Sequence, residues 1–166
     1  MKKIAGTSRL ILRELHPSDA NSFFELNANP NVIRYTGNAA FKDVAEATEF
    51  LEHYSDYKEN GYGRWAVVLK DSGRFVGWCG LKFDEETQQT DIGFRFFEAE
   101  WGKGYATESA EACLQLGFDA FALDCIIGRA MKANRASIRV LEKLGLTYEK
   151  DILLDGADAV LYKIKK

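Results

Sequence analysis

The sequence predicts one α/β domain, residues 1–166, built on a mixed β-sheet. First, the hydrophobic periodicities follow the order β-α-α-β-β-β-α-β-α-β-β. Second, a single strand–helix–strand segment, from Thr90 to Met131, is long enough for a parallel crossover, and such crossovers are right-handed. Third, 166 residues that are 46% hydrophobic are enough to form one core. No internal repeat or linker divides the chain.

The individual elements follow from apolar spacing and from turn residues. Alternation or β-rich composition predicts strands at Ser8–Leu15, Arg64–Lys70, Arg74–Phe83, Thr90–Phe97, Asp124–Met131, Leu146–Leu154 and Ala159–Ile164. Helical spacing predicts helices at Pro17–Ala28, Asp43–Lys58, Ala106–Phe121 and Asn134–Leu144. The strand that ends at Phe97 therefore leads through a short turn into the longest helix.

The composition argues against several classes of protein. The net charge of −3 does not favour binding to nucleic acid or to an anionic membrane, and no apolar run approaches the ~18 residues that span a bilayer. Three widely spaced cysteines indicate reduced thiols and thus a cytoplasmic protein. Because His16 and His53 are the only histidines, we expect no metal centre.

The most informative segment is the glycine-rich turn EWGKGYATESA, residues 100–110. Gly102 and Gly104 lack a Cβ, so the backbone there can adopt a positive φ and a ligand can approach it closely. The helix that follows presents unpaired N–H groups and the positive end of its dipole. Together these features predict a site for a phosphate-carrying cofactor.

Other interpretations of this turn fit the sequence less well. A dinucleotide-binding fingerprint has a third glycine where this chain has Thr107, and one crossover is too few for its doubly wound sheet, although Asp124 offers the expected acid. A P-loop needs Gly-Lys-Ser/Thr after an earlier glycine, which Gly102-Lys103-Gly104 does not supply. A turn without any ligand is the alternative that the turn chemistry alone leaves open.

Two motifs resemble the GCN5-related N-acetyltransferase (GNAT) superfamily. They are IGFRFFEAEWGKGYATES and, further along, NRASIRVLEKLGL, and the resemblance covers nearly the whole chain. The family's acetyl-CoA loop, Gln/Arg-x-x-Gly-x-Gly/Ala, falls on residues 101–106, with matches at Gly104 and Ala106. Trp101 departs from the first position. That departure and the start TSRLILRELHPSDA look like the branch of ribosomal-protein N-terminal acetyltransferases (RimJ/RimL-like).

The resemblance implies acetyl-CoA as co-substrate, with no metal. The backbone N–H groups from Gly102 to Thr107 would then hold its pyrophosphate. The strand Thr90–Phe97 would splay away from the strand Asp124–Met131, and the pantetheine arm would enter the gap with Phe94 and Arg95 beside the acetyl group. The residues assigned to the cofactor are Phe94, Arg95, Trp101, Gly102, Lys103, Gly104, Tyr105, Ala106, Thr107 and Asn134.

Coenzyme A also carries a 3′-phosphate, which local cations must offset on a net-negative protein. We expect Lys103 in the loop to do this. Further cations cluster near the last helix, namely Lys132, Arg135, Arg139 and Lys143. Each of these is otherwise an ordinary solvated charge.

The family transfers acetyl directly, which agrees with the lack of an evident Cys–His or Ser–His pair. Its usual tyrosine acid falls at Leu141, which cannot donate a proton. In the RimJ/RimL-like branch a serine at the position of Ser137 is the implied proton donor, and Asp91 is our candidate for the general base. Ordinary helix packing of Ser137 and helix capping by Asn134 are the alternatives.

The sequence therefore predicts a cytoplasmic, acetyl-CoA-dependent N-acetyltransferase, a monomer or a homodimer. Its acceptor is a primary amine, first a protein or peptide N-terminus and alternatively a small molecule such as a polyamine, an amino acid or an aminoglycoside. A non-catalytic acyl-CoA-binding sensor and a dinucleotide oxidoreductase are the rival classes. Aromatic residues of the first two helices are expected to line part of the acceptor groove.

Overall fold

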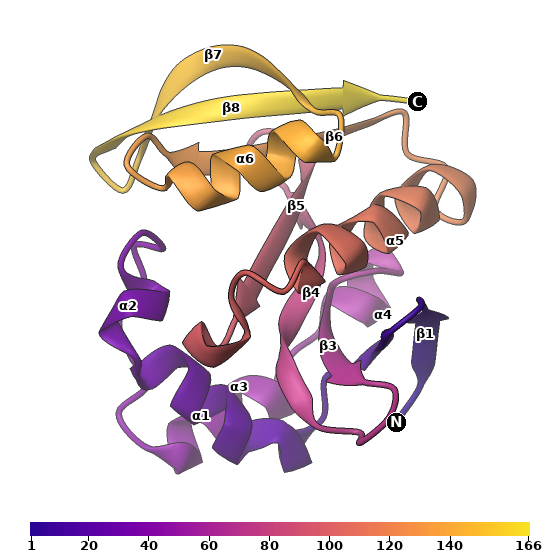
Figure 1. Ribbon diagram of the computed structural model, residues 1–166, viewed down its shortest axis with the longest axis vertical. Coiled ribbons are helices and arrows are strands. Elements are labelled where there is room, and N and C mark those ends of the chain that lie inside the picture. Colours follow the sequence, from indigo (N-terminus) through magenta and orange to yellow (C-terminus); the bar gives the residue numbers. More distant parts are fainter.

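All eight strands belong to one sheet in the computed structural model, which describes residues 1–166 (Figure 1). Their spatial order is β1-β2-β3-β4-β5-β6-β8-β7. The strands are β1 (Lys3–Gly6), β2 (Leu10–Glu14), β3 (Arg64–Leu69), β4 (Phe75–Asp84), β5 (Gln89–Phe96), β6 (Cys125–Met131), β7 (Thr147–Leu154) and β8 (Ala157–Lys165). The predicted α/β class with a mixed sheet is confirmed, because β5 and β6 are parallel and the other neighbouring pairs are antiparallel.

Helices cover both faces of the sheet. They are α1 (Ala20–Ala28), α2 (Pro30–Ile33), α3 (Val44–Glu52), α4 (Asp56–Asn60), α5 (Tyr105–Asp119) and α6 (Arg135–Lys143), with 3-10 turns at Pro17–Asp19 and Glu98–Glu100. Figure 1 places α5 in the middle of the molecule and α6 beside β6 and β8, while α1 and α3 lie together at the other end. None of these helices has both the length and the apolar character to cross a membrane.

Strand β3 is buried on both faces, which makes this part of the molecule a three-layer structure. Trp65 and Val67 belong to the core that α5 covers, where they join Cys113. Ala66 and Val68 point to the opposite face, where α1 and α3 pack. Four consecutive buried residues therefore reflect two cores and the alternation of side chains along a strand.

The sheet opens between β5 and β6, as the sequence predicts. Strand β5 pairs with β4 over eight positions, from Gly77↔Phe96 to Asp84↔Gln89. With β6 it shares a single pair, Asp91↔Ile127. Figure 1 shows β5 slanting away from β6 toward α1. The two strands therefore diverge beyond Asp91 and leave an edge of β5 without a strand partner.

Ion pairs connect the strands at the point where β5 and β6 meet. Arg64 Nη2 lies 2.7 Å from Asp91 Oδ1, and Arg129 Nη2 lies 2.8 Å from Asp91 Oδ2. Arg129 also reaches Asp84, at 3.5 Å. A Cβ at Gly93 would lie 2.6 Å from Arg64 Nη2, so the lack of a side chain at Gly93 leaves the space that the Arg64 guanidinium occupies. The network thus joins β3, β5 and β6 across the opening.

The prediction of one continuous helix over Asp43–Lys58 is wrong in the middle of the segment. It divides into α3 and α4 around residues 53–55. The Tyr54 hydroxyl accepts from Arg64 N at 2.7 Å, and the Tyr57 hydroxyl donates to Arg64 O and accepts from Leu15 N at 3.0 Å. These bonds tie the break to the start of β3, so tertiary hydrogen bonding overrides the apolar periodicity of one continuous helix.

Two short elements escape the sequence analysis. Strand β1 is a short edge strand that pairs with β2. Its four residues show no clear alternation of apolar and polar side chains. The segment Asn29-Pro30-Asn31 predicts the end of a helix. In the structure it is also the start of α2. The Asn29 side chain accepts from Asn31 N at 2.9 Å and Pro30 occupies the first turn, so the two residues cap a new helix.

Asp91→Asn should lower the free energy of unfolding by about 3 kcal/mol, because it leaves two arginines without their carboxylate. Urea denaturation at neutral pH measures the change. Asp151→Asn is the matched control, since it breaks the surface pair with Lys132 at 2.9 Å and should leave the stability near the wild-type value. Equal stabilities of the two variants would contradict the role given to Asp91.

Candidate active site

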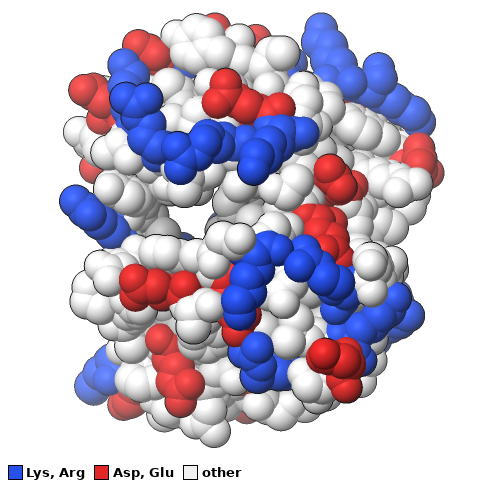
Figure 2. Space-filling model, in the orientation of Figure 1, with Lys and Arg blue, Asp and Glu red and all other residues white.

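Two cavities meet where the sheet opens. The inner cavity, about 830 Å³, lies among β4, β5, β6 and the segment 35–41. The loop cavity, about 700 Å³, lies between the glycine turn and α6. Both are lined by Tyr35, Thr36, Phe94, Arg95, Asn134 and Ser137. Figure 2 shows the hollow between the part that carries α6 and the part that carries α1 and α2. The two cavities are therefore continuous.

The glycine turn has the geometry of an anion site. Gly102 and Gly104 have φ of +76° and +82°, a region that side chains with a Cβ rarely adopt. Gly104 is the N-cap of α5 and provides no side-chain cap. None of the backbone N–H groups from Gly102 to Thr107 donates to an acceptor within the protein. Six unpaired donors at a helix start therefore face the loop cavity or solvent.

Residues just before the turn hold it in place. Buried Glu100 accepts from Arg74 and from Lys103 Nζ, the latter at 2.9 Å. Hydrogen bonds from Arg74 and then Lys103 lower the pKa of Glu100 and keep it charged. The Trp101 indole donates from Nε1 to Phe96 O at 3.0 Å, so it ties the turn to the end of β5.

The expectation for Lys103 needs correction. Its ammonium is paired with Glu100, and its side chain is not among those that line the loop cavity. Arg139 and Lys143 line that cavity and have no ion-pair partner. Figure 2 shows Lys and Arg side chains running across the face of α6, above the hollow. Exposed cations of α6 are therefore better placed than Lys103 to meet a phosphate of the ligand.

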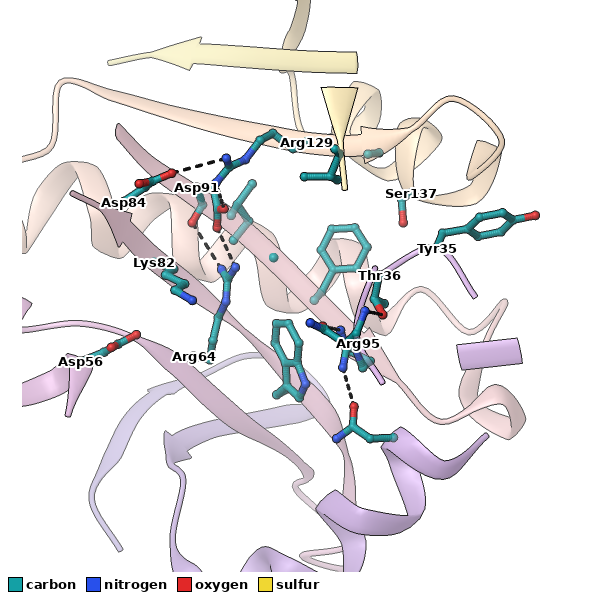
Figure 3. Close-up of a pocket in the computed structure, with 18 of the residues that line it drawn as sticks. Tyr35, Thr36, Asp56, Arg64, Lys82, Asp84, Asp91, Arg95, Arg129 and Ser137 are labelled. Atoms are coloured by element: carbon teal, nitrogen blue, oxygen red, sulfur yellow. Dashed lines mark hydrogen bonds and ion pairs between the residues drawn. The ribbon is translucent and has the colours of Figure 1, made fainter. Parts of the chain in front are cut away.

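Phe94, Arg95, Asn134 and Ser137 lie together at the junction of the two cavities. Asn134 is the N-cap of α6, and its Oδ1 accepts from Ser137 N at 3.3 Å. The Ser137 hydroxyl has no protein partner, and Figure 3 shows it pointing from α6 into the cavity. A hydroxyl donor and a strand edge thus lie on opposite sides of the opening. The other predicted cofactor residues, Trp101, Gly102, Gly104, Tyr105, Ala106 and Thr107, line the loop cavity.

Asp91 lines the inner cavity, but its surroundings do not favour a general base. Burial alone would raise the pKa of this carboxyl; the positive charges and hydrogen bonds of Arg64 and Arg129 outweigh burial and leave the pKa below its usual range. Figure 3 shows the carboxylate between the two guanidinium groups. A carboxylate with a lowered pKa binds a proton poorly, so we assign Asp91 to the architecture of the cavity.

Arg95 and Trp78 form the floor of the inner cavity. Arg95 donates to Asn27 Oδ1 and, at 3.0 Å, to Asn38 Oδ1. The guanidinium groups of Arg95 and Arg64 each lie 5.2 Å from the centroid of the Trp78 ring. Burial, followed by the charge of Arg64, lowers the pKa of Arg95 to about 10.

Aromatic side chains form one wall of the inner cavity. Phe23, Phe41, Phe50 and Tyr54 line the inner cavity and contact one another through neighbouring rings, with the Phe23–Phe41 centroids 5.7 Å apart. They come from α1, α3, the connection between α2 and α3, and the break between α3 and α4. Apolar surface of this kind favours the apolar part of an acceptor.

Arg64, Trp78, Arg129 and Asn27 were not predicted as site residues. A usable signal exists for Arg129, which interrupts the otherwise apolar strand β6, and for Arg64, which begins the apolar strand β3. Such charged residues are seldom buried without a partner. The pairing itself joins residues far apart in the chain and has no signal in one sequence. Asn27 is fully inside, where its Nδ2 donates to Phe23 O at 2.8 Å.

A helix start suited to an anion, beside a sheet that opens between two parallel strands, is the kind of site that holds a phosphate-carrying ligand with its other end in the opening. Residues 9–147 match the family of acetyltransferase (GNAT) domains. The chain therefore belongs to the GNAT family, and it is an acetyl-CoA-dependent N-acetyltransferase. The finer RimJ/RimL-like assignment stays a prediction.

Relatives and solved structures agree with this family. The chain is 36% identical over 164 residues to the uncharacterized protein YkkB of Bacillus subtilis (strain 168), covering 96% of this chain and 94% of the relative. The GNAT-family acetyltransferase structure from Bacillus anthracis is 25% identical, with a TM-score of 0.84 and 96% of each chain covered. A spermidine N-acetyltransferase from Vibrio cholerae, in complex with CoA and spermine, shares the fold at 20% identity, with a TM-score of 0.80 over 95% of this chain and 96% of that one.

Gly104→Val should raise the KM for acetyl-CoA by at least about tenfold, because the side chain crowds the ligand and strains the backbone whose amides bind it. Steady-state kinetics measures the change. Gly73→Val is the matched control: its φ is +70° in the turn between β3 and β4, away from both cavities, and no atom lies within 4 Å of its added Cβ. The same rise in both variants would remove the loop from cofactor binding.

Arg139→Gln should raise the KM for acetyl-CoA by about two- to fivefold, the effect of an exposed charge contact. Lys103→Gln should change it less, because the ammonium is held by Glu100. The difference should shrink as salt screens exposed charges. A larger effect of Lys103→Gln at low salt would restore the original expectation for that residue.

Proposed function

We propose that this protein transfers acetyl directly from acetyl-CoA to a primary amine, without a covalent enzyme intermediate. One observation carries the proposal: the unpaired amides from Gly102 to Thr107 border a cavity that continues into a second, charged cavity at Phe94 and Ser137. A cofactor gripped by its pyrophosphate in the first would present its thioester to an amine entering through the second. No cysteine or histidine lines either cavity, so neither offers a nucleophile–base pair.

The edge of β5 beyond Asp91 provides the proposed oxyanion donor. It has no partner strand on its β6 side, because the two strands share one pair. A backbone N–H at Phe94 or Arg95 that points into the gap is fixed by the pairing of β5 with β4. A preorganised donor of this kind contributes about 3 kcal/mol to transition-state stabilisation.

Ser137 is the proposed donor to the departing thiolate. Its hydroxyl faces the junction and is not used by another protein group. Leu141, at the position of the family's tyrosine, is buried and packs against Gly128 of β6, so it contributes no proton. Because a thiol has a pKa near ~8.5, the thiolate is already a tolerable leaving group and the gain from Ser137 is modest.

A peptide N-terminus as the incoming amine needs little help to lose its proton. Its α-amino group has a pKa of ~7.7 to 8.0, so part of it is neutral near neutral pH. Asp91 is held as a paired carboxylate and is not needed as a base. Deprotonation by solvent water in the inner cavity fits both facts.

Two classes of acceptor fit a primary-amine site. The RimJ/RimL-like resemblance favours a protein or peptide N-terminus. The interior of the inner cavity favours a small amine, because the cavity carries charges of both signs close to its aromatic wall. Its acids are Asp56, Asp84, Glu85 and Asp91, and its cations are Arg64, Lys82, Arg95 and Arg129. A neutral peptide backbone has no charged groups to pair with these side chains, whereas a small charged molecule has them.

Free-thiol release from acetyl-CoA with a panel of acceptors tests the proposal. The panel combines peptides of varied first residue, polyamines, aminoglycosides and amino acids, and calorimetry with coenzyme A runs in parallel. Amine-dependent thiol release with an acetylated product is expected. Binding of coenzyme A without turnover of any amine would instead identify the acyl-CoA sensor, and binding of a nicotinamide cofactor alone would identify the oxidoreductase.

Ser137→Ala should lower kcat by up to about tenfold, less than full general-acid catalysis contributes because the thiolate already leaves well, with little change in the KM for acetyl-CoA. Ser137→Thr keeps a hydroxyl and should retain more of the rate. Both are measured against pH with the best acceptor of the panel. A wild-type kcat for the alanine variant across the pH range would exclude Ser137 as proton donor.

A further inference from the structure

Resting on the proposed function, we infer that the acceptor is a small amino-acid-like amine whose carboxylate binds Arg95. The inference concerns the chemical class of acceptor and the residue that selects it. It follows from the one arginine of the inner cavity that has no anionic partner, and from where that arginine lies relative to the opening of the sheet.

The arginines of the inner cavity differ in how their charge is neutralised. Arg64 and Arg129 share the carboxylate of Asp91, at 2.7 and 2.8 Å, and Arg129 also contacts Asp84. Arg95 has no carboxylate within ion-pair distance. Its protein acceptors are the neutral amide oxygens of Asn27 and Asn38. The positive charge of Arg95 is therefore uncompensated in a half-buried position.

The guanidinium is held in a fixed orientation. Buried Asn27 fixes Nη1, Asn38 fixes Nη2 at 3.0 Å, and the Trp78 ring lies beneath at 5.2 Å. Two of the five N–H donors are used in this way, which leaves three for a ligand. Figure 3 shows Arg95 in this setting, next to Thr36 and below Ser137. A planar donor group prepared in advance favours a planar bidentate anion, which is the chemistry of a carboxylate.

The electrostatic environment supports an anionic ligand. Burial and the neighbouring charge of Arg64 lower the pKa of Arg95 to about 10, so the charged form is disfavoured by its surroundings. A bound carboxylate would relieve that cost, because a buried charge is stabilised when it is paired. A polyamine would add positive charge beside Arg95 and increase the electrostatic cost of the buried guanidinium.

The position of Arg95 makes the contact relevant to the reaction. Arg95 follows Phe94 on β5, at the junction where the acetyl group is expected, so a carboxylate bound there lies within a few bonds of the attacking amine. An amino acid has this short spacing between amine and carboxylate. The aromatic wall of Phe23, Phe41 and Phe50 can receive its side chain. The phosphates of the cofactor would not require Arg95, because the loop amides, Arg139 and Lys143 would be available to meet them.

Three acceptors test the inference: phenylalanine, phenylalaninamide and phenethylamine, which differ in the carboxylate and its replacement. Because these groups also change the basicity of the amine, the rates are compared per neutral amine over a range of pH. Thiol release gives kcat/KM for each with the wild type, Arg95→Gln, Arg95→Lys and Lys82→Gln. The wild type should prefer the carboxylate form by about ten- to a hundredfold, since an unpaired guanidinium rejects ligands that lack the anion. If phenylalanine is too large, the same triplet is made from alanine.

Arg95→Gln should abolish the preference by lowering kcat/KM for the carboxylate form, with the KM for acetyl-CoA unchanged. Arg95→Lys should keep part of it, because it retains charge but not the planar fork. Lys82→Gln removes an exposed cation of the same cavity and should keep the preference. Thermal unfolding of each variant checks that it folds, which matters most for Arg95→Gln because it releases buried Asn27.

Thermal shifts by the same acceptors, in the presence of coenzyme A, separate the two proposals. Acetylation of all three acceptors with equal kcat/KM, or a rise in the KM for acetyl-CoA as the sole effect of Arg95→Gln, overturns the inference while acetyl transfer stands. Stabilisation by carboxylates that depends on Arg95, without any acetylation, supports the anion site and overturns the proposed function. Preference for peptides over every small carboxylate overturns the inference in favour of an N-terminal acceptor.

Discussion

The site depends on one carboxylate shared by two arginines. Asp91 lies at the single point where β5 and β6 pair, and it is held by Arg129 of the neighbouring strand β6 and by Arg64 of β3, which lies beyond β4. Because the parallel strands are joined there and diverge beyond, a cavity forms without any loss of the antiparallel ladder between β4 and β5. A continuous parallel ladder would fill this opening with backbone hydrogen bonds and leave no route for a pantetheine arm. The ion pairs thus maintain an otherwise incomplete sheet.

The two ends of the site use different electrostatics. At the cofactor end, backbone dipoles from Gly102 to Thr107 offer donors that carry no net charge, and exposed cations of α6 lie opposite them. Such a surface binds a highly charged, well-hydrated ligand and releases it again. At the proposed acceptor end, Arg64, Arg129 and Asp91 are partly buried and paired with one another, whereas half-buried Arg95 has no anionic partner. Discrimination among acceptors is therefore expected at the buried end, where an unpaired group costs most.

The prediction from sequence succeeds where local periodicity and tertiary packing agree. The longest helix, the meander of β3, β4 and β5 and the last hairpin follow from apolar spacing and turn residues, and Asn134 caps α6 as its side chain predicts. It fails where distant groups intervene. Tyr54 and Tyr57 bind the backbone near Arg64 and divide a helix that its own pattern makes continuous. The edge strand β1 owes its conformation to β2 and has little signal of its own.

By itself, the sequence determined the anion-binding turn, because glycine conformations and free helix amides are properties of a few consecutive residues. Most of the order of elements also follows from the sequence, except β1, α2 and the division between α3 and α4. The family resemblance, and not the turn, points to Phe94, Arg95, Asn134 and Ser137. The tertiary structure alone decided which charges are neutralised: Asp91 by two arginines, Lys103 by Glu100, and Arg95 by no anion. Pairing of this kind depends on distances between strands and helices far apart in the chain, and Coulomb energies change with separation and burial in ways that one-dimensional spacing does not record.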